Sequence, residues 1–227
     1  MTPREGIPDR LPHLTQDYLK AIFQLSEWDK EPVTATRISS ELGLKPSTTT
    51  EGLKRLESQG LIRREPYKPI ELTNDGRKAA VEMVRRHRLI ETFLVRSLGY
   101  SWDEVHDEAE RLEHAVSPTF VERIADALGN PDRDPHGDPI PDAKGRIATA
   151  SVHSLAIVAT GEDVVVERIS DRDPELLRYL EAHGIVPGAG VAVAERPYPS
   201  MLHVAVADAI VPISAESAEL VRIRNKV

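Results

Sequence analysis

The N-terminal part of the chain shows apolar positions at the spacing of three successive helices. In residues 15–24 they recur every three or four residues and form one stripe of a helix. A second amphipathic segment spans residues 33–44, with a stop at Gly43, and a third spans residues 46–60. Their apolar positions are Tyr18, Leu19, Ile22, Phe23, Ile38, Leu42, Leu44, Leu53 and Leu56. Two short helices across a glycine-containing turn predict a helix-turn-helix.

A hairpin is predicted directly after these helices. Residues 61–73 alternate apolar and polar side chains on both sides of a turn at residues 66–69. Thr48 and Glu51 have capping-box spacing, so we expect them at the start of the third helix. A basic hairpin beside a helix-turn-helix predicts a winged helix-turn-helix. The alternative is a helical hairpin that packs on a ribbon without binding DNA.

Three further helices are predicted at residues 73–99, 102–116 and 117–129. Ser101 and Glu104 have capping-box spacing before the second of them. The apolar positions are Val84, Leu89, Phe93, Leu94, Leu112, Phe120, Ile124 and Leu128. These side chains can bury an interface between protomers as well as a core, so we expect a dimerisation region here.

The C-terminal part has the pattern of a small β domain. Residues 130–149 are rich in proline, aspartate and glycine and predict a loop or linker. Beyond it, short alternating runs surround one helix at residues 174–184. The runs are residues 163–169, 189–197, 201–208, 209–214 and 219–224. This arrangement predicts a β-barrel of SH3-like size.

Composition narrows the class of protein. The chain has 227 residues and no cysteine, which excludes disulfide scaffolds, thiolate zinc fingers, iron–sulfur sites and cysteine nucleophiles. The sequence shows no secretory signal and no apolar run of ~18 residues, so we expect a cytoplasmic protein without a membrane partner. The formal net charge of -8 argues against coating nucleic acid by bulk charge.

A local basic patch nevertheless lies at the predicted helix-turn-helix and wing. We expect short polar side chains of the third helix near the major groove, and basic side chains at DNA phosphates. The groove candidates are Ser47, Thr48, Thr50 and Glu51, and the basic candidates are Lys45, Lys54, Arg55, Arg63, Arg64 and Lys68. Each of these residues could instead be a helix cap or a solvated surface group without a role in DNA binding. DNA shape and bridging waters would then supply part of the specificity.

Histidines and carboxylates recur at helical spacing in the middle of the chain. The predicted helix after Ser101 places four of them along one side: His106, Glu110, Glu113 and His114. The preceding helix adds His87 and Glu91, four residues apart. Such groups converging from two helices predict a divalent-metal site. A solvated acidic face with salt bridges to Arg85, Arg86 and Arg88 explains the spacing equally well.

A metal-dependent hydrolase is the competing function, since histidine–glutamate pairs also bind catalytic metals or transfer protons. The sequence has no HExxH motif, no GxSxG motif and no phosphate-binding glycine loop, so we expect no enzyme. His136 in the DPHGDP segment could act as a ligand or base, but a tight polar loop is the commoner explanation.

Longer motifs together resemble the diphtheria-toxin-repressor family of metal-dependent transcriptional regulators, over essentially the whole chain. They are TQDYLK at residues 15–20, RRHRLIETFLV at 85–95, LGYSWDEVHDEAERLEH at 98–114 and the NPxxxPHGDPIP loop at 130–141. The resemblance implies a dimeric repressor that binds pseudo-palindromic operators of metal-homeostasis genes when loaded with metal.

The family's organisation implies a mainly α fold with small β parts in three domains. A winged helix-turn-helix DNA-binding domain would span residues 1–73, and a helical metal-binding and dimerisation domain residues 74–146. An SH3-like (FeoA-like) domain would span residues 147–227. We expect this third domain to donate a metal ligand or stabilise the active state, and a partner-binding module is the alternative.

The resemblance also implies two metal positions. The first would be formed by Asp17, Glu110, Glu113 and His114. The second would use His87, Glu91 and His106, completed by groups of the third domain, for which the candidates are Glu167 and Asp171.

The expected metal follows from a difference within the family. Iron-responsive members have a methionine and a cysteine where this chain has Asp17 and Glu110. Carboxylate oxygen in place of soft sulfur favours a harder cation, so the chain resembles the manganese-sensing branch and Mn(II) is the expected cofactor. The alternative is an Fe(II)-dependent regulator, and Co(II) or other divalent transition metals stay open. Lys20 stands where some manganese sensors have another carboxylate, which favours separate sites over a two-ion cluster.

Overall fold

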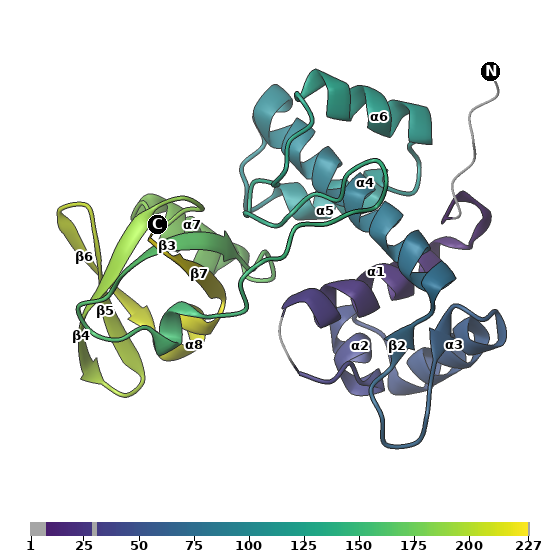
Figure 1. The fold of residues 1–227 in the computed structure, drawn as a ribbon, viewed down its shortest axis with the longest axis horizontal. Coiled ribbons are helices and arrows are strands. Elements are labelled where there is room, and N and C mark those ends of the chain that lie inside the picture. Colours follow the sequence, from purple (N-terminus) through teal and green to yellow (C-terminus); the bar gives the residue numbers. More distant parts are fainter. Residues whose placement is uncertain (1–7, 29–30, 227) are drawn as a thin grey trace. The chain divides into compact units, whose positions relative to one another are not determined.

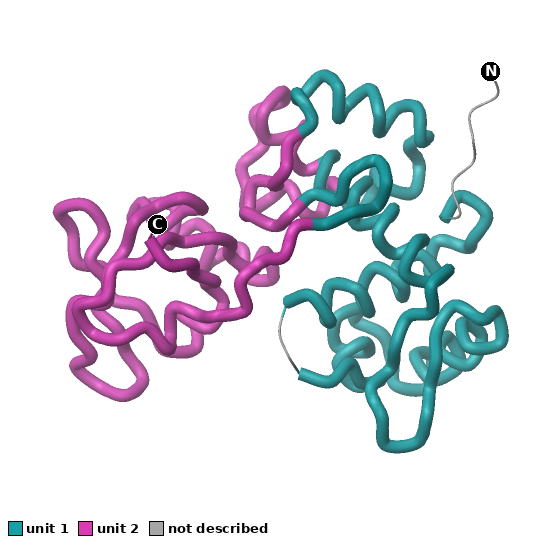
Figure 2. The backbone as a smooth tube through the Cα atoms, viewed as in Figure 1, with its two compact units in different colours: residues 1–90, 110–130, 140–147 teal, residues 91–109, 131–139, 148–227 magenta. Residues whose placement is uncertain are grey.

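The computed structural model describes residues 8–28 and 31–226 (Figure 1). The chain folds into two compact units (Figure 2). Unit 1 consists of residues 1–90, 110–130 and 140–147, and unit 2 of residues 91–109, 131–139 and 148–227.

The winged helix-turn-helix is confirmed in unit 1. After the 3-10 turn η1 (Pro8–Arg10), its elements are α1 (His13–Trp28), α2 (Ala35–Glu41), α3 (Pro46–Ser58), β1 (Ile62–Arg63) and β2 (Glu71–Leu72). The two strands pair antiparallel, with Ile62 opposite Leu72, and the connection between them forms the wing. The predicted apolar stripes of α1, α2 and α3 meet in one core that includes Tyr18, Ile22, Ile38, Leu53 and Leu56.

The predicted capping boxes are wrong. Helix α3 begins at Pro46 with Lys45 at the N-cap, so Thr48 lies inside the helix. Proline at the first helical position explains the earlier start, because its fixed φ suits the helix and its missing N–H needs no partner there. In the next segment, α5 begins at Val105, well after Ser101.

Three helices follow the wing: α4 (Asn74–Leu98), α5 (Val105–Leu112) and α6 (Pro118–Ala127). The predicted start of α6 is confirmed, because the Ser117 side chain accepts a hydrogen bond from the Phe120 amide and Pro118 opens the helix. The ring of Phe120 is exposed.

The middle of α4 is buried although it carries three arginines. Arg85, Arg86 and Arg88 are each less than a tenth exposed. Arg85 donates to Glu122 and to the Pro141 carbonyl. Arg86 donates to Asp9 and to the Glu113 carbonyl. Arg88 donates to Glu27. These arginines therefore pin α1, the α5–α6 turn and the N-terminal segment onto α4. The alternative of a solvated acidic face neutralised by these three side chains is wrong.

Unit 2 contains a five-stranded antiparallel sheet in the order β6-β5-β4-β3-β7. Its strands are β3 (Asp163–Ile169), β4 (Gly190–Tyr198), β5 (Met201–Val206), β6 (Ala209–Ser214) and β7 (Val221–Asn225). The five predicted runs and the helix α7 (Pro174–Ala182) are confirmed. The short elements η2 (Leu155–Ile157) and α8 (Ala215–Glu219) were not predicted from the sequence.

A loop of residues 131–139 packs on β3 inside unit 2. The Ile169 amide donates to the His136 carbonyl, and the buried Arg168 side chain donates to Asp138. Gly137, with φ +90°, lies so close to the backbone of β3 that a Cβ there would collide with the Glu167 carbonyl. The loop and the strand are thereby held in one register.

None of the helices in the described part of the chain is both long enough and apolar enough to cross a bilayer.

The close approach at Gly137 yields a test of this packing. Gly161 also has positive φ, +84°, but nothing lies within 4 Å of its Cβ position. We expect Gly161→Ala to cost about 1 kcal/mol of unfolding free energy from backbone strain alone. Gly137→Ala should cost about 1–3 kcal/mol more, because the loop must also move off β3. Urea unfolding of both variants measures the difference, and equal losses would contradict the packing.

Candidate metal centre

Unit 1 contains the first group of predicted ligands, here called the primary cluster: Asp17, Glu110, Glu113 and His114. Asp17 lies on α1, Glu110 on the last turn of α5, and the other two in the turn after α5. The His114 Nε2 is 2.9 Å from Asp17 Oδ1 and 3.6 Å from Glu113 Oε1. Asp17, Glu113 and His114 each offer a ligand atom within 4.8 Å of the others.

Lys20 connects Glu110 to Glu113 through two hydrogen bonds. Its Nζ donates to Glu110 Oε1 at 2.5 Å and to Glu113 Oε1 at 2.7 Å. Lys20 lies one turn after Asp17, so α1 presents both to the α5 end of the cluster. Burial alone would lower the pKa of Lys20, but the charges of Glu113 and Glu110 outweigh it and raise the pKa.

Glu113 is the most buried carboxylate of the cluster, with no exposed surface. His87 on α4 places its Nδ1 2.6 Å from Glu113 Oε2. Burial acts to raise the pKa of Glu113, yet the charges of His87 and Lys20 reverse this and lower the pKa to about 2. Glu113 is therefore an anion held between the Lys20 ammonium and the His87 imidazole. The contact of His87 with the primary cluster was not predicted from the sequence.

Gln16 orients the imidazole of His114. The Gln16 amide nitrogen donates to the carbonyls of Pro8 and Leu11, at 3.0 and 2.8 Å. Its carboxamide oxygen then faces His114 Nδ1 at 3.0 Å, which leaves Nε2 directed at the carboxylates. The hydrogen bond to Asp17 is the main cause that raises the pKa of His114. Sequence spacing gave no indication of Gln16, because it is uncharged and lies outside the His and Glu pattern.

Unit 2 contains a second group, the secondary cluster: Glu91, His106 and Asp171. The His106 Nδ1 is 3.0 Å from Asp171 Oδ2 and 3.3 Å from Glu91 Oε1. Burial works against the charged imidazole, but Asp171 and then Glu91 raise the pKa of His106 to about 11. His106 opposes the effect of burial on Asp171 and lowers the pKa of that carboxyl.

His136 and Asp134 lie beside Glu91, although the sequence favoured a tight polar loop over a ligand role for His136. These three residues each have a ligand atom within 4.8 Å of the others. The expected tight polar loop is confirmed, because Asp134 Oδ1 accepts from the amides of His136 and Asp138. The imidazole ring of His136 is fixed at one nitrogen, because Nε2 contacts the Trp102 carbonyl at 2.6 Å. Its buried Nδ1 has no hydrogen-bond partner among the described residues and lies 4.0 Å from Glu91 Oε2.

Glu167 does not join either cluster. Its Oε1 accepts from Arg133 at 2.7 Å and its Oε2 from the Ser151 amide at 2.8 Å. Both oxygens are thus occupied in holding the 131–139 loop and the segment before β3, and we leave Glu167 out of the candidate site. Of the two third-domain candidates, only Asp171 is near His106.

The donor atoms fit a divalent transition ion. Both clusters offer carboxylate oxygens and imidazole nitrogens, and the chain has no cysteine. Such donors suit Mn(II), Fe(II) or Co(II) better than soft ions. The orphaned His136 Nδ1 and the directed His114 Nε2 are lone-pair positions of the kind that an ion satisfies.

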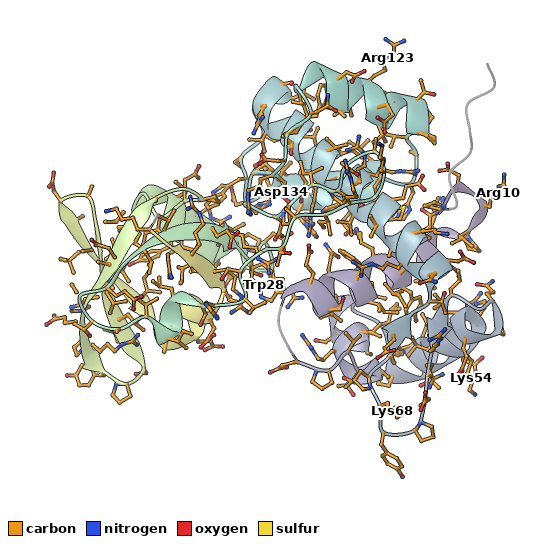
Figure 3. All side chains as sticks on the ribbon, in the orientation of Figure 1. Arg10, Trp28, Lys54, Lys68, Arg123 and Asp134 are labelled. Atoms are coloured by element: carbon orange, nitrogen blue, oxygen red, sulfur yellow. The ribbon has the colours of Figure 1, made fainter. Side chains whose placement is uncertain are left out.

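The predicted DNA-contacting residues lie on the surface of α3 and the wing (Figure 3). All are exposed except Arg64, which is partly buried. The labelled Lys54 and Lys68 extend away from the fold, and their ion pairs with Glu51 and Glu65 are at the surface. Thr49 faces the core instead, so Thr48 and Thr50 flank a buried position.

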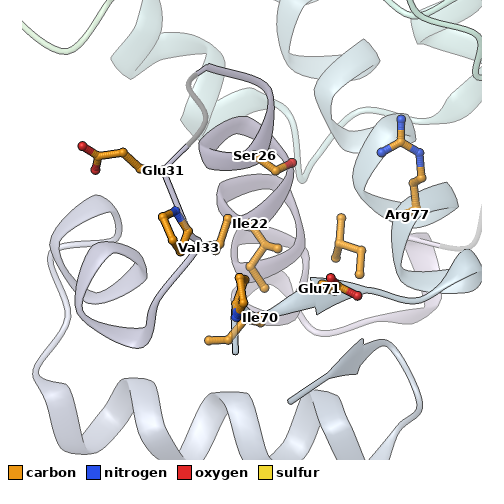
Figure 4. A pocket seen from close by; sticks show the side chains of 10 residues that line it. Ile22, Ser26, Glu31, Val33, Ile70, Glu71 and Arg77 are labelled. Carbon is orange, nitrogen blue, oxygen red and sulfur yellow. The ribbon is translucent and has the colours of Figure 1, made fainter. Parts of the chain in front are cut away.

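A pocket of about 550 Å³ lies in the DNA-binding part of unit 1 (Figure 4). Ile22, Val33 and Ile70 are among its lining residues, together with Glu31, Glu71 and Arg77. Its lining includes no member of either cluster. This pocket is therefore no substrate cavity for a metal held by them, as the hydrolase alternative would require.

Three family models match consecutive parts of the chain. Residues 10–70 match the iron dependent repressor N-terminal DNA binding domain, and residues 73–142 match the iron dependent repressor metal binding and dimerisation domain. Residues 153–225 match the FeoA domain.

Similar proteins cover nearly the whole chain. The iron-dependent repressor IdeR of Mycobacterium leprae is 33% identical over 93% of this chain and 96% of its own. A solved manganese-dependent transcriptional repressor in complex with manganese is 42% identical, with a TM-score of 0.88 over 93% of this chain and 100% of its own. The manganese regulator SloR is 30% identical, with a TM-score of 0.80 over 93% and 98%.

The ion pair of His106 predicts how the metal-free protein responds to pH. Its folded pKa of about 11 lies above the unfolded value of about 6.5, so the pair stabilises the fold fully below pH 6.5. This contribution is lost as the pH rises toward the folded pKa. We expect the Tm of the chelator-treated protein to fall between pH 7 and pH 9, and Asp171→Asn to make that fall shallower.

Thermal unfolding at several pH values measures this slope. Asp208→Asn removes a carboxylate from an exposed turn of the same unit and serves as the control. An equally steep fall in the Asp171→Asn variant and the wild type would contradict the proposed role of the pair.

Proposed function

Because the chain belongs to the diphtheria-toxin-repressor family of metal-dependent transcriptional repressors, we propose that it is an Mn(II)-dependent dimeric repressor of metal-homeostasis genes. It binds pseudo-palindromic operators when it is loaded with metal. The observation that supports the proposal most directly is the primary cluster, where carboxylates and an imidazole converge from α1 and from the end of α5.

The choice of Mn(II) rests on donor chemistry. Asp17 and Glu110 supply oxygen at both positions where iron-responsive relatives are expected to have sulfur. The 42% identical solved structure is a manganese-dependent repressor, whereas the mycobacterial relative is iron-dependent. Fe(II) is the alternative metal, and an Fe(II)-dependent regulator with the same ligands is the alternative function.

We assign the ion of the primary cluster to Asp17, Glu110, Glu113 and His114. A second ion would be held by Glu91, His106 and Asp171, with His136 and Asp134 close enough to take part. The family resemblance adds His87 to this second set. When bound, each ion supplies positive charge that neutralises carboxylates and replaces the proton on an imidazole.

The mechanism follows from which elements the primary cluster joins. Asp17 lies on the first helix of the winged helix-turn-helix, whereas Glu110, Glu113 and His114 lie at the end of α5. Carboxylates gathered at one place repel each other, so the arrangement that ties α1 to α5 gains most from the ion. Because the ion has better contacts in that arrangement, it shifts the population toward it.

The favoured arrangement fixes the two recognition helices of a dimer at the separation of operator half-sites. In each protomer α3 enters the major groove, with Ser47, Thr48, Thr50 and Glu51 near the bases. The basic residues of α3 and the wing bind phosphates. By linkage, operator DNA tightens metal binding by the same factor as metal tightens DNA binding.

We propose a separate function for each of the three domains, at residues 1–73, 74–146 and 147–227. The first binds DNA, the second binds metal and dimerises, and the SH3-like third donates Asp171 to the secondary cluster. The repressor works in the cytoplasm, where its operators are.

We expect Glu110→Ala and His114→Ala to weaken Mn(II)-stimulated DNA binding more than about 100-fold while leaving a folded dimer, because each removes a ligand of the primary cluster. Asp107→Ala removes an exposed carboxylate from the same helix and should change nothing. Fluorescence anisotropy on DNA from upstream of its own gene and of metal-transporter genes, with Mn(II) or chelator, measures the effect. Full Mn(II) stimulation in both ligand variants would refute the assignment.

The metal preference has a separate test. Asp17→Met combined with Glu110→Cys introduces the soft donors of iron-responsive relatives and should shift activation from Mn(II) toward Fe(II). Anaerobic titration of DNA binding with each metal gives the ranking. An unchanged ranking would mean that groups outside the ligand set decide selectivity.

A further inference from the structure

Lys20 has a position that the proposed function leaves unexplained. Its ammonium is almost fully buried and bridges Glu110 Oε1 and Glu113 Oε1 at 2.5 and 2.7 Å. These are two of the carboxylates that would bind the ion of the primary cluster. A cation is thus already present at the oxygens that a divalent ion would need.

Lys20 and the proposed ion share the same oxygen atoms. The Glu113 Oε1 that accepts from Lys20 is also the oxygen nearest to His114 Nε2, at 3.6 Å. The other oxygen of Glu113 is held by His87 at 2.6 Å. Neither oxygen of Glu113 is therefore available to an arriving ion unless a present contact is weakened.

Other lysines of unit 1 differ sharply from Lys20. Lys78 on α4 pairs with Asp75 at 3.5 Å, and both side chains are about two-thirds exposed or more. Lys54 and Lys68 pair with neighbouring glutamates at the surface. Such exposed pairs contribute little to stability, whereas a buried ammonium must be compensated by its carboxylates.

Building on the proposed function, we infer that Lys20 is a resident placeholder cation, which holds Glu110 and Glu113 together in the metal-free protein and competes with the divalent ion for their oxygens. Metal binding then exchanges a monovalent cation for a divalent one at the same carboxylates. The competition raises the metal concentration at which the protein becomes loaded, so Lys20 sets the threshold of the response.

This role predicts effects of opposite sign on stability and on affinity. Lys20→Met keeps an unbranched side chain but removes the charge, so the metal-free protein loses the compensation of two carboxylates and its Tm falls. The same change removes repulsion between the ammonium and the incoming ion, so Mn(II) binds at least about tenfold more tightly. A purely structural lysine would predict a loosened site, with unchanged or weaker Mn(II) binding.

Isothermal titration with Mn(II) measures the affinity, and His106→Ala serves as a common background in which the secondary cluster is disabled. The variants are Lys20→Met, Lys20→Gln and, as the matched control, Lys78→Met, which removes an exposed charge from the same unit. We expect at least about tenfold tighter binding for both Lys20 variants and no change for the control. Lys20→Gln retains a polar group and provides the measurement if Lys20→Met fails to fold.

Thermal unfolding with and without Mn(II) completes the test. We expect a lower Tm for the metal-free Lys20 variants and a larger rise in Tm on adding Mn(II) than in the wild type. Unchanged or weaker Mn(II) binding in a folded Lys20 variant overturns the placeholder role. A Lys20-containing protein that binds no Mn(II) at all contradicts the proposed function itself, so the two failures are distinguishable.

Discussion

The arrangement of unit 1 depends on compensating the charge of Glu113. This carboxylate is fully buried, and a buried anion is tolerated only when cationic partners surround it. Lys20 comes from α1 and His87 from α4, while Glu113 itself lies in the turn after α5. Three elements that are distant in the sequence must therefore meet at one point. The buried arginines of α4 extend the same principle, because each fixes a different segment to that helix.

The two clusters use similar residues in different electrostatic settings. In the primary cluster, the carboxylates are shared between an imidazole and the Lys20 ammonium. In the secondary cluster, His106 is the principal cation, and beside it lies His136, whose Nδ1 has no hydrogen-bond partner in the described part of the chain. Replacing the His106 proton by a metal ion exchanges one positive charge for two. In the proposed function, an ion at the secondary cluster therefore displaces the His106 proton, whereas an ion at the primary cluster displaces the Lys20 ammonium.

The two clusters take their residues from different parts of the chain. The primary cluster includes Asp17 on α1, the first helix of the part that matches the DNA binding domain, so in the proposed function an ion bound there acts on that part. The secondary cluster includes Asp171, which directly follows strand β3 and its neighbour Ser170 in the FeoA part. The loop of residues 131–139 brings His136 to the same place through its register with β3. Each of the three parts that match family models therefore contributes to one or the other cluster.

Most of the secondary structure and the kind of chemistry could be predicted from the sequence alone. Apolar periodicity located the helices and strands, because burial of one face is a local property of spacing. The absence of cysteine and the recurrence of His and Glu at helical spacing limited the donors to oxygen and nitrogen. The resemblance to the family then implied Asp17, Glu110, Glu113 and His114 as one ligand set.

Which charged side chains share a site could be seen only in the folded chain. It placed Lys20 between two candidate ligands, turned Gln16 toward His114, brought His136 beside Glu91 and engaged both oxygens of Glu167 elsewhere. Spacing could not reveal these contacts, because they join residues up to 98 positions apart and depend on how buried charges compensate each other. The capping box predicted at Thr48 failed because Pro46, three residues after Gly43, fixed the start of α3 earlier than the side-chain pattern indicated.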